Sequence, residues 1–147
     1  MGLVYAEIEL ISAEDIGLAR RYIIGDEEIK QTRVLMLVDT GAFMMAINEN
    51  IQAHLDLGFQ YRTRYALADG KIAEYDVVGP VKVKFANREA SCNAVVLPGD
   101  SEPLLGAIPM EEMDVLIHPS RQELIVNPEH QGSAVHRLPS IRPAYMR

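Results

Sequence analysis

An aspartate closes a strongly apolar stretch, and this feature constrains the fold more than any other. Five apolar residues, Val34 to Val38, precede Asp39-Thr40-Gly41, and the chain is apolar again over residues 43–47. A short apolar run bounded by turn residues is typical of a strand buried on both faces, so we expect a central strand over residues 29–39. Asp, Thr and Gly are also common turn residues. The triplet alone therefore leaves a structural turn and a catalytic carboxylate open, although a charge between two apolar segments is costly.

The remainder of the chain up to residue 129 has the pattern of a mostly β domain. Residues 3–10 and 81–85 alternate between apolar and other side chains, which is typical of strands with one buried face. Short helices are expected after the capping residues Ser12 and Asn48 and over residues 108–113. No repeat and no linker interrupts this pattern, so we predict a single domain over residues 1–129.

A hairpin turn is predicted at Asp69-Gly70, between two of these strands. Asp-Gly favours a two-residue turn, which would pair Leu67 with Ile72. Further along, Gly79-Pro80 is expected to break the returning strand.

Composition limits the chemistry that is open to this chain. With 147 residues, 48% of them hydrophobic, the chain can bury a core without disulfides. Cys92 is the only cysteine, and the four histidines lack partners at metal-ligand spacing. We therefore predict no metal site and no cofactor, and we expect Cys92 to be a small buried hydrophobe.

The charge is divided unevenly along the chain. All 21 acidic residues and 11 of the 14 basic ones precede residue 130, which gives the body a net charge of −10 and the last 18 residues +3. An acidic body argues against nucleic acid as a partner. We see neither a signal peptide nor about 18 consecutive apolar residues, so we expect a cytoplasmic protein with no membrane partner. Residues 130–147 are predicted to form a flexible basic tail.

A second motif, Leu104-Leu105-Gly106, lies directly before the helix predicted at residue 108. With Asp39-Thr40-Gly41 upstream, the sequence resembles the retropepsin-like aspartic peptidases of the small bacterial and cellular branch, over residues 3–127. In that family a strand ends in Asp-Thr/Ser-Gly, a flap hairpin follows, and an apolar-apolar-Gly segment passes beside the catalytic loop. The resemblance implies a closed, mostly β acid-protease barrel with a flap hairpin and one or two short helices.

The resemblance also implies a role for particular residues. Asp39 would be the catalytic carboxylate, with Thr40, Gly41 and Ala42 supporting the active-site loop and the Thr40 hydroxyl reaching the other subunit. The flap would consist of Leu67, Ala68, Asp69, Gly70, Lys71 and Ile72, and the residues packed behind the loop would be Leu104, Leu105 and Gly106. Viral members carry an ion pair where this chain has Phe43-Met44 and Ala107-Ile108, so we expect apolar packing to replace it.

Because the chain has one such aspartate and is too short for two lobes, an active enzyme must be a two-fold homodimer. We therefore predict an aspartic endopeptidase that acts on extended peptide or protein substrates, with Asp39 from each subunit activating a water molecule. A catalytically silent barrel that binds peptides or serves as a dimerisation module is the alternative. A third reading is a domain regulated by its basic tail.

Two other polar residues are interpreted as structural. Asp69 is a favoured turn residue. His118, which precedes Pro119 at a strand end, is expected to be a surface or hydrogen-bonded histidine.

Overall fold

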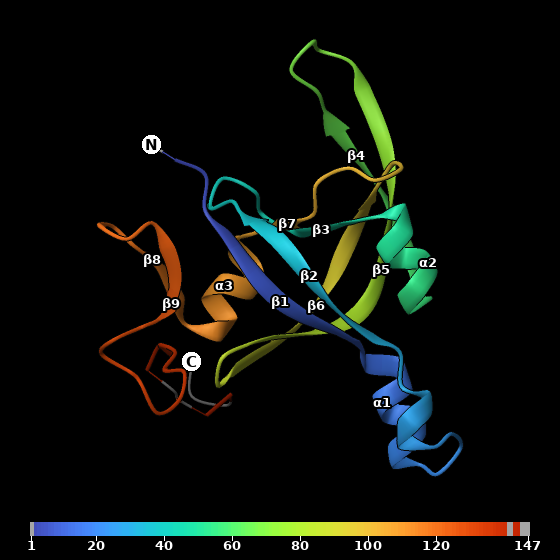
Figure 1. Cartoon of the computed structure of the whole chain (residues 1–147), viewed down its shortest axis with the longest axis horizontal. Helices are drawn as coiled ribbons and strands as arrows, with labels where there is room; N and C mark the ends of the chain where they lie inside the picture. Colours follow the sequence, from blue (N-terminus) through green and yellow to red (C-terminus); the bar gives the residue numbers. More distant parts are fainter. Residues whose placement is uncertain (1, 141–142, 145–147) are drawn as a thin grey trace.

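Figure 1 shows the computed structural model of the chain, which describes residues 2–140 and 143–144. None of the helices in this part of the chain is long and apolar enough to cross a membrane. The elements, in chain order, are β1 (Tyr5–Ser12), α1 (Ala13–Arg20), the 3₁₀ turn η1 (Asp26–Glu28), β2 (Gln31–Val38), β3 (Met45–Asn48), α2 (Glu49–Leu55), β4 (Gly58–Ala66), β5 (Ile72–Phe85), β6 (Arg88–Leu97), β7 (Leu104–Leu105), α3 (Ala107–Met113), β8 (Val115–His118) and β9 (Glu123–Val126).

The sheet closes on itself. Its strand order is β1-β2-β7-β3-β6-β5-β4, and β1 also pairs with β5, for example Leu10 with Val83. Six strands thus form a ring, while β4 lies outside it and β8 and β9 form a separate hairpin. The closed, mostly β barrel of retropepsin type is confirmed, with three α-helices in the described residues rather than one or two.

The helices begin where the sequence predicts them. Ser12 accepts a hydrogen bond from the Asp15 amide at 3.2 Å and caps α1, and Asn48 accepts one from the Ile51 amide at 2.9 Å and caps α2. These side chains supply acceptors for amides that the first helical turn leaves unpaired. The third predicted helix is α3.

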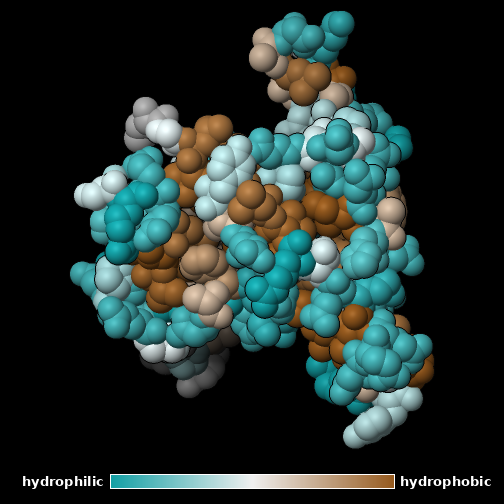
Figure 2. All heavy atoms as spheres, in the orientation of Figure 1, coloured by the Kyte–Doolittle hydropathy of each residue, from teal (hydrophilic) through white to brown (hydrophobic). Residues whose placement is uncertain are grey.

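The barrel interior holds the main core. In β1 the side chains of Ala6, Ile8 and Leu10 are buried, and the intervening glutamates face outward. The strand expected to be central, β2, is buried on one face only, because Leu35 is 63% exposed. It pairs with β7 only at Leu37 and Val38. In the space-filling view, apolar side chains accordingly reach the surface over β1 and β2 (Figure 2).

The hairpin of β4 and β5 projects from the barrel (Figure 1). Its predicted register is wrong by one residue, because Ala66 pairs with Ile72 and the Leu67 amide donates to the Lys71 carbonyl at 2.8 Å. Gly70 has φ of +85°, and the Asp69 carboxylate accepts from the Lys71 amide at 2.9 Å, so the turn becomes a three-residue loop.

The break predicted at Gly79-Pro80 is also wrong. The strand β5 continues through both residues, and the irregularity is absorbed by a register shift between Val78 and Val81 in its pairing with β6.

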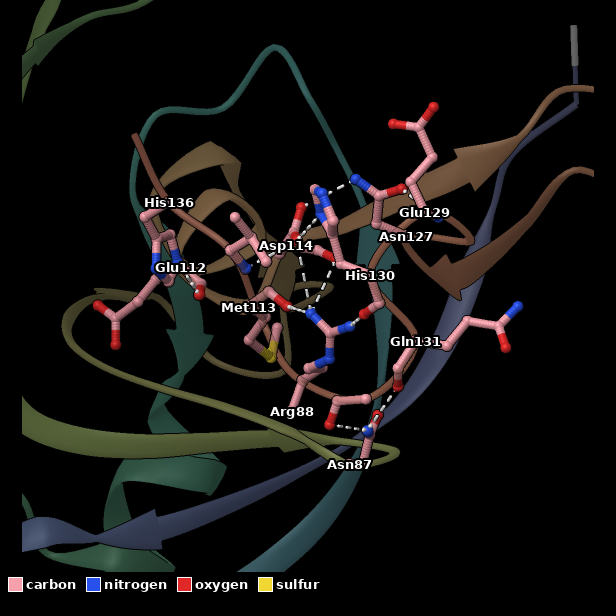
Figure 3. Close-up of polar contacts among 12 residues, drawn as sticks. Asn87, Arg88, Glu112, Met113, Asp114, Asn127, Glu129, His130, Gln131 and His136 are labelled. Atoms are coloured by element: carbon pink, nitrogen blue, oxygen red, sulfur yellow. Dashed lines mark hydrogen bonds and ion pairs between the residues drawn. The ribbon is translucent and has the colours of Figure 1, made fainter. Parts of the chain in front are cut away.

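The segment after β9 is bound to the barrel by a polar cluster around Asp114 (Figure 3). The Asp114 carboxylate contacts Asn127 Nδ2 at 3.1 Å, His130 Nδ1 at 2.7 Å and the Val135 amide at 3.1 Å. The buried Arg88 guanidinium donates to the Met113 carbonyl at 3.0 Å and to the His130 carbonyl. The first part of the predicted tail therefore contacts the domain. Its flexibility stays a prediction, and residues 141–142 and 145–147 lie outside the described residues.

The cluster around Asp114 generates a prediction for stability against pH. Hydrogen bonds from Asn127, the Val135 amide and His130 hold the pKa of Asp114 well below its usual range. A carboxyl group with a lowered pKa stabilises the fold above its ordinary pKa of about 4, and this stabilisation is lost as the pH falls through the lowered value. We expect Asp114→Asn to reduce the melting temperature by several degrees at pH 7, with a difference from the parent that narrows below about pH 4.

Thermal unfolding at pH 7, 5 and 3 measures this difference. Asp100→Asn, in an exposed loop, is the matched control and should unfold like the parent throughout. If Asp114→Asn lowers the melting temperature equally at all three pH values, the electrostatic explanation is contradicted.

Candidate active site

Asp39 directly follows β2, where this strand meets β7. The two strands run parallel, with Leu37 beside Leu104 and Val38 beside Leu105. The Asp39 amide donates to the Leu105 carbonyl at 3.0 Å. Because Leu105 is fully buried, this bond ties the start of the loop to the barrel core.

The loop after Asp39 folds back on its carboxylate. The Gly41 amide donates to Asp39 Oδ1 at 2.9 Å, and the Ala42 amide donates to the Asp39 carbonyl at 3.1 Å. A Cβ atom at Gly41 would lie 3.2 Å from Asp39 Oδ1, which favours glycine there. The carboxylate is half-buried and held in one orientation, while Thr40 is exposed on the loop.

The start of α3 supports the loop from behind. The Ala107 amide donates to the Ala42 carbonyl at 2.8 Å, and the Ile108 amide donates to the Phe43 carbonyl at 3.1 Å. A Cβ atom at Gly106 would lie 2.8 Å from the Ala42 carbonyl oxygen and closer still to that of Met44. The structure thus places Leu104, Leu105 and Gly106 against the loop that contains Asp39.

The expected replacement of an ion pair by apolar packing is wrong at Phe43, whose side chain is 74% exposed. Backbone hydrogen bonds from the first amides of α3 connect the two segments instead. These amides have no partner within their own helix, so the loop carbonyls satisfy them.

Two hollows flank the loop. One, of about 470 Å³, lies between the loop and the flap. It is lined by Gly41, Ala42, Phe43, Met44, Ala46, Tyr65, Ala66, Leu67, Tyr75, Val95, Leu97 and Leu104. The other, of about 540 Å³, is lined by Gly2, Leu3, Val4, Leu37, Val38, Asp39, Thr40, Ile117, Pro119 and Gln122. Asp39 is the only acidic residue among the described residues that line them.

The predicted flap residues contribute unequally to the first hollow. Leu67 lines it, whereas Ala68, Asp69, Gly70, Lys71 and Ile72 form or follow the exposed loop at the tip. Tyr65, Tyr75 and Met44 line the hollow as well and were missed at the sequence level. The spacing of the two tyrosines about the Asp-Gly turn was the available signal.

The other two candidate residues, Cys92 and His118, lie in environments that indicate a structural role. Burial raises the pKa of the Cys92 thiol to about 12, which disfavours a thiolate nucleophile. His118 Nδ1 accepts hydrogen bonds from the amides of Ser120 and Arg121 in a turn. Within the described residues, no three His, Cys, Asp or Glu side chains gather closely enough to hold a metal ion.

A closed β-barrel with a supported Asp-Thr-Gly loop facing a hairpin defines a protein of the acid-protease class. A comparison with protein families agrees, since a family described as aspartyl protease matches residues 26–108, more than half of the chain. The chain belongs to this retropepsin-like aspartyl protease family. A comparison with the curated proteins found no match.

The close approach at Gly106 gives a prediction. A methyl group there would press on two backbone carbonyls of the loop, so we expect Gly106→Ala to cost about 1–3 kcal/mol of unfolding free energy, as overpacking does. Gly132→Ala is the matched control, because a Cβ atom there meets nothing within 4 Å.

Chemical denaturation of both variants measures the difference. Equal stability of Gly106→Ala and Gly132→Ala would contradict the proposed packing behind the loop.

Proposed function

We propose that the protein is an aspartic endopeptidase that acts as a two-fold homodimer and hydrolyses peptide bonds in extended peptide or protein substrates. The single observation that supports this most is the position of Asp39. Its carboxylate lies on a loop fixed by backbone hydrogen bonds, next to two apolar hollows of which one lies beside a projecting hairpin. Asp39 lines the hollow away from the flap, and Gly41 and Ala42 of the same loop line the hollow beside the flap, so an extended chain that fills both hollows passes the carboxylate.

The chemistry requires a second carboxylate. One carboxylate must take a proton from water while a protonated one donates to the carbonyl oxygen of the substrate. Two carboxylates about 3 Å apart cannot both ionise and therefore share a proton, which supplies both roles. A two-fold axis beside Asp39 brings the two copies together. Thr40, exposed on the same loop, is proposed to donate its hydroxyl across this axis.

The flap is proposed to bind the substrate. An extended peptide bound between hairpin and loop forms main-chain hydrogen bonds, and pockets for alternate side chains set the specificity. No metal or cofactor enters this mechanism. A cytoplasmic location is part of the proposal and rests on the sequence.

Replacement of the carboxylate tests the catalytic role. We expect Asp39→Asn to lose cleavage of a diverse peptide mixture by at least about 10³-fold between pH 4 and 7, because the amide cannot act as a base. Asp26→Asn, in the exposed turn η1, should retain the activity of the parent. Mass spectrometry of the new termini measures both.

Two outcomes of that digest would contradict the proposal in different ways. Cleavage that persists in Asp39→Asn assigns the activity to another residue or to a contaminant. No cleavage by a parent protein that is demonstrably dimeric favours the alternative, a silent barrel that binds peptides in the same hollow.

Subunit mixing tests whether each active site uses Asp39 from two chains. When a tenfold excess of Asp39→Asn exchanges with the parent, random pairing leaves roughly one parent chain in eleven with a parent partner. We expect the rate to fall roughly tenfold, while the same excess of Asp26→Asn does not lower it. An unchanged rate after complete exchange would rule out the shared site.

A further inference from the structure

Two large apolar side chains near Asp39 are exposed and have no role in the site described so far. The side chain of Phe43, at the end of the Asp39 loop, is 74% exposed, and that of Leu3, just before β1, is 70% exposed. Single exposed apolar side chains are common on protein surfaces. These two, however, border the loop that the proposed homodimer brings to its two-fold axis, and they carry an inference that rests on this part of the proposed function.

Leu3 and Phe43 lie on opposite sides of the loop. Leu3 lines the hollow that Asp39 also lines, away from the flap. Its position is fixed by the neighbouring backbone, because the Val38 amide donates to the Val4 carbonyl at 2.8 Å. Figure 1 shows this N-terminal segment beside the loop that joins β2 and β3. Phe43 lines the other hollow, between the loop and the flap, so the loop separates the two exposed side chains.

A two-fold axis beside Asp39 brings these two sides together. In an isologous interface, a residue on one side of the axis meets the second copy's residue from the opposite side, and the contact occurs twice. Leu3 of one subunit therefore faces the side on which Phe43 of the partner subunit lies. Neither residue meets its own copy, because only residues on the axis do so.

The surface on both sides of the loop is free of charge apart from Asp39. Beside Leu3, none of the other described residues that line the hollow is acidic or basic. Beside Phe43, the same holds for the described lining of the flap hollow and of a smaller one of about 300 Å³. A chain with a net charge of −7 repels its own copy. Contact between two copies is therefore favoured where charged side chains are missing.

We propose that Leu3 of each subunit packs against Phe43 of the partner subunit, and that these two reciprocal contacts hold the pair of Asp39 carboxylates at the two-fold axis. The contacts remove from water two apolar side chains that a single subunit leaves exposed. Aromatic side chains are enriched and charged ones depleted at the centre of interfaces, which agrees with Phe43 and its surroundings. Leu3 of the partner subunit also closes the hollow beside the flap at Phe43, so one subunit alone leaves this hollow incomplete.

Cross-linking of mixed variants tests which residues face each other. Leu3→Cys and Phe43→Cys are each made in the full-length Cys92→Ala protein, so that the introduced thiol is the only one. Equal amounts of the two variants are exchanged and treated with a short bismaleimide. Random pairing makes about half of the dimers mixed, so we expect up to roughly half of the chains to form covalent dimers. Either variant alone should stay uncross-linked.

Tyr22→Cys, mixed with Phe43→Cys in the same background, is the matched control. Tyr22 is 94% exposed and lies directly after α1, at the opposite end of the molecule from the flap (Figure 1). Its thiol is accessible to the reagent but lies far from the proposed axis. A covalent dimer from this mixture, or from Phe43→Cys alone, in the yield of the test mixture would overturn the contact.

Sedimentation velocity over a range of concentrations measures the strength of the contact. We expect Phe43→Asp to raise the dissociation constant of the dimer at least about tenfold, because it buries two carboxylates without a partner. Adding Leu3→Lys to the same chain places an opposite charge in each contact and should bring the constant back to within about threefold of the parent. A double variant that dissociates more readily than Phe43→Asp would contradict the pairing.

These measurements need no turnover, so the two proposals fail separately. Selective cross-linking of Leu3→Cys with Phe43→Cys, in a protein that cleaves no peptide, overturns the peptidase and supports the contact. A dimer that cleaves, loses activity on mixing with Asp39→Asn and gives no selective cross-link overturns the contact and leaves the peptidase standing. A parent that is monomeric and inactive overturns both.

Discussion

The site depends on the hydrogen bonds that fasten the Asp39 loop to the segment formed by β7 and the start of α3. With two residues, β7 runs parallel to β2 and antiparallel to β3, and so joins the strands on either side of the loop. The Leu105 carbonyl accepts a hydrogen bond from the Asp39 amide. The amides of Ala107 and Ile108 donate hydrogen bonds to carbonyls of the loop. The carboxylate is therefore positioned by backbone atoms, and the side chains of the loop remain available for contacts with substrate or partner.

This arrangement also explains which parts could be predicted. Hydrophobic alternation and capping residues are local signals, so β1, α1, α2 and the Asp39 turn follow from the sequence. The proximity of Leu104-Leu105-Gly106 to Asp39 is a long-range contact, and only the family resemblance indicated it. The particular barrel came from that resemblance as well, because strand periodicity does not define the order β1-β2-β7-β3-β6-β5.

The errors have physical causes that are not encoded locally. Leu35 is exposed because it alternates with the buried Met36 along β2 and therefore lies on the opposite, outer face of the strand. The flap turn has three residues instead of the predicted two because the Asp69 carboxylate accepts a hydrogen bond from the Lys71 amide. The Asp-Gly pair alone does not decide between the two turn lengths. The cluster around Asp114 joins Arg88, Asn127 and His130, which lie up to 42 residues apart in sequence, and no spacing rule indicates such a group.

The central claim is that two copies of Asp39 form one site, and a crystal structure of the protein in its cleaving form tests it most directly. The quantity to measure is the shortest distance between carboxylate oxygens of Asp39 in the two subunits. We predict about 3 Å, within hydrogen-bond reach and close enough to share a proton. A monomer, or a dimer formed through another face with the two carboxylates far apart, would contradict it.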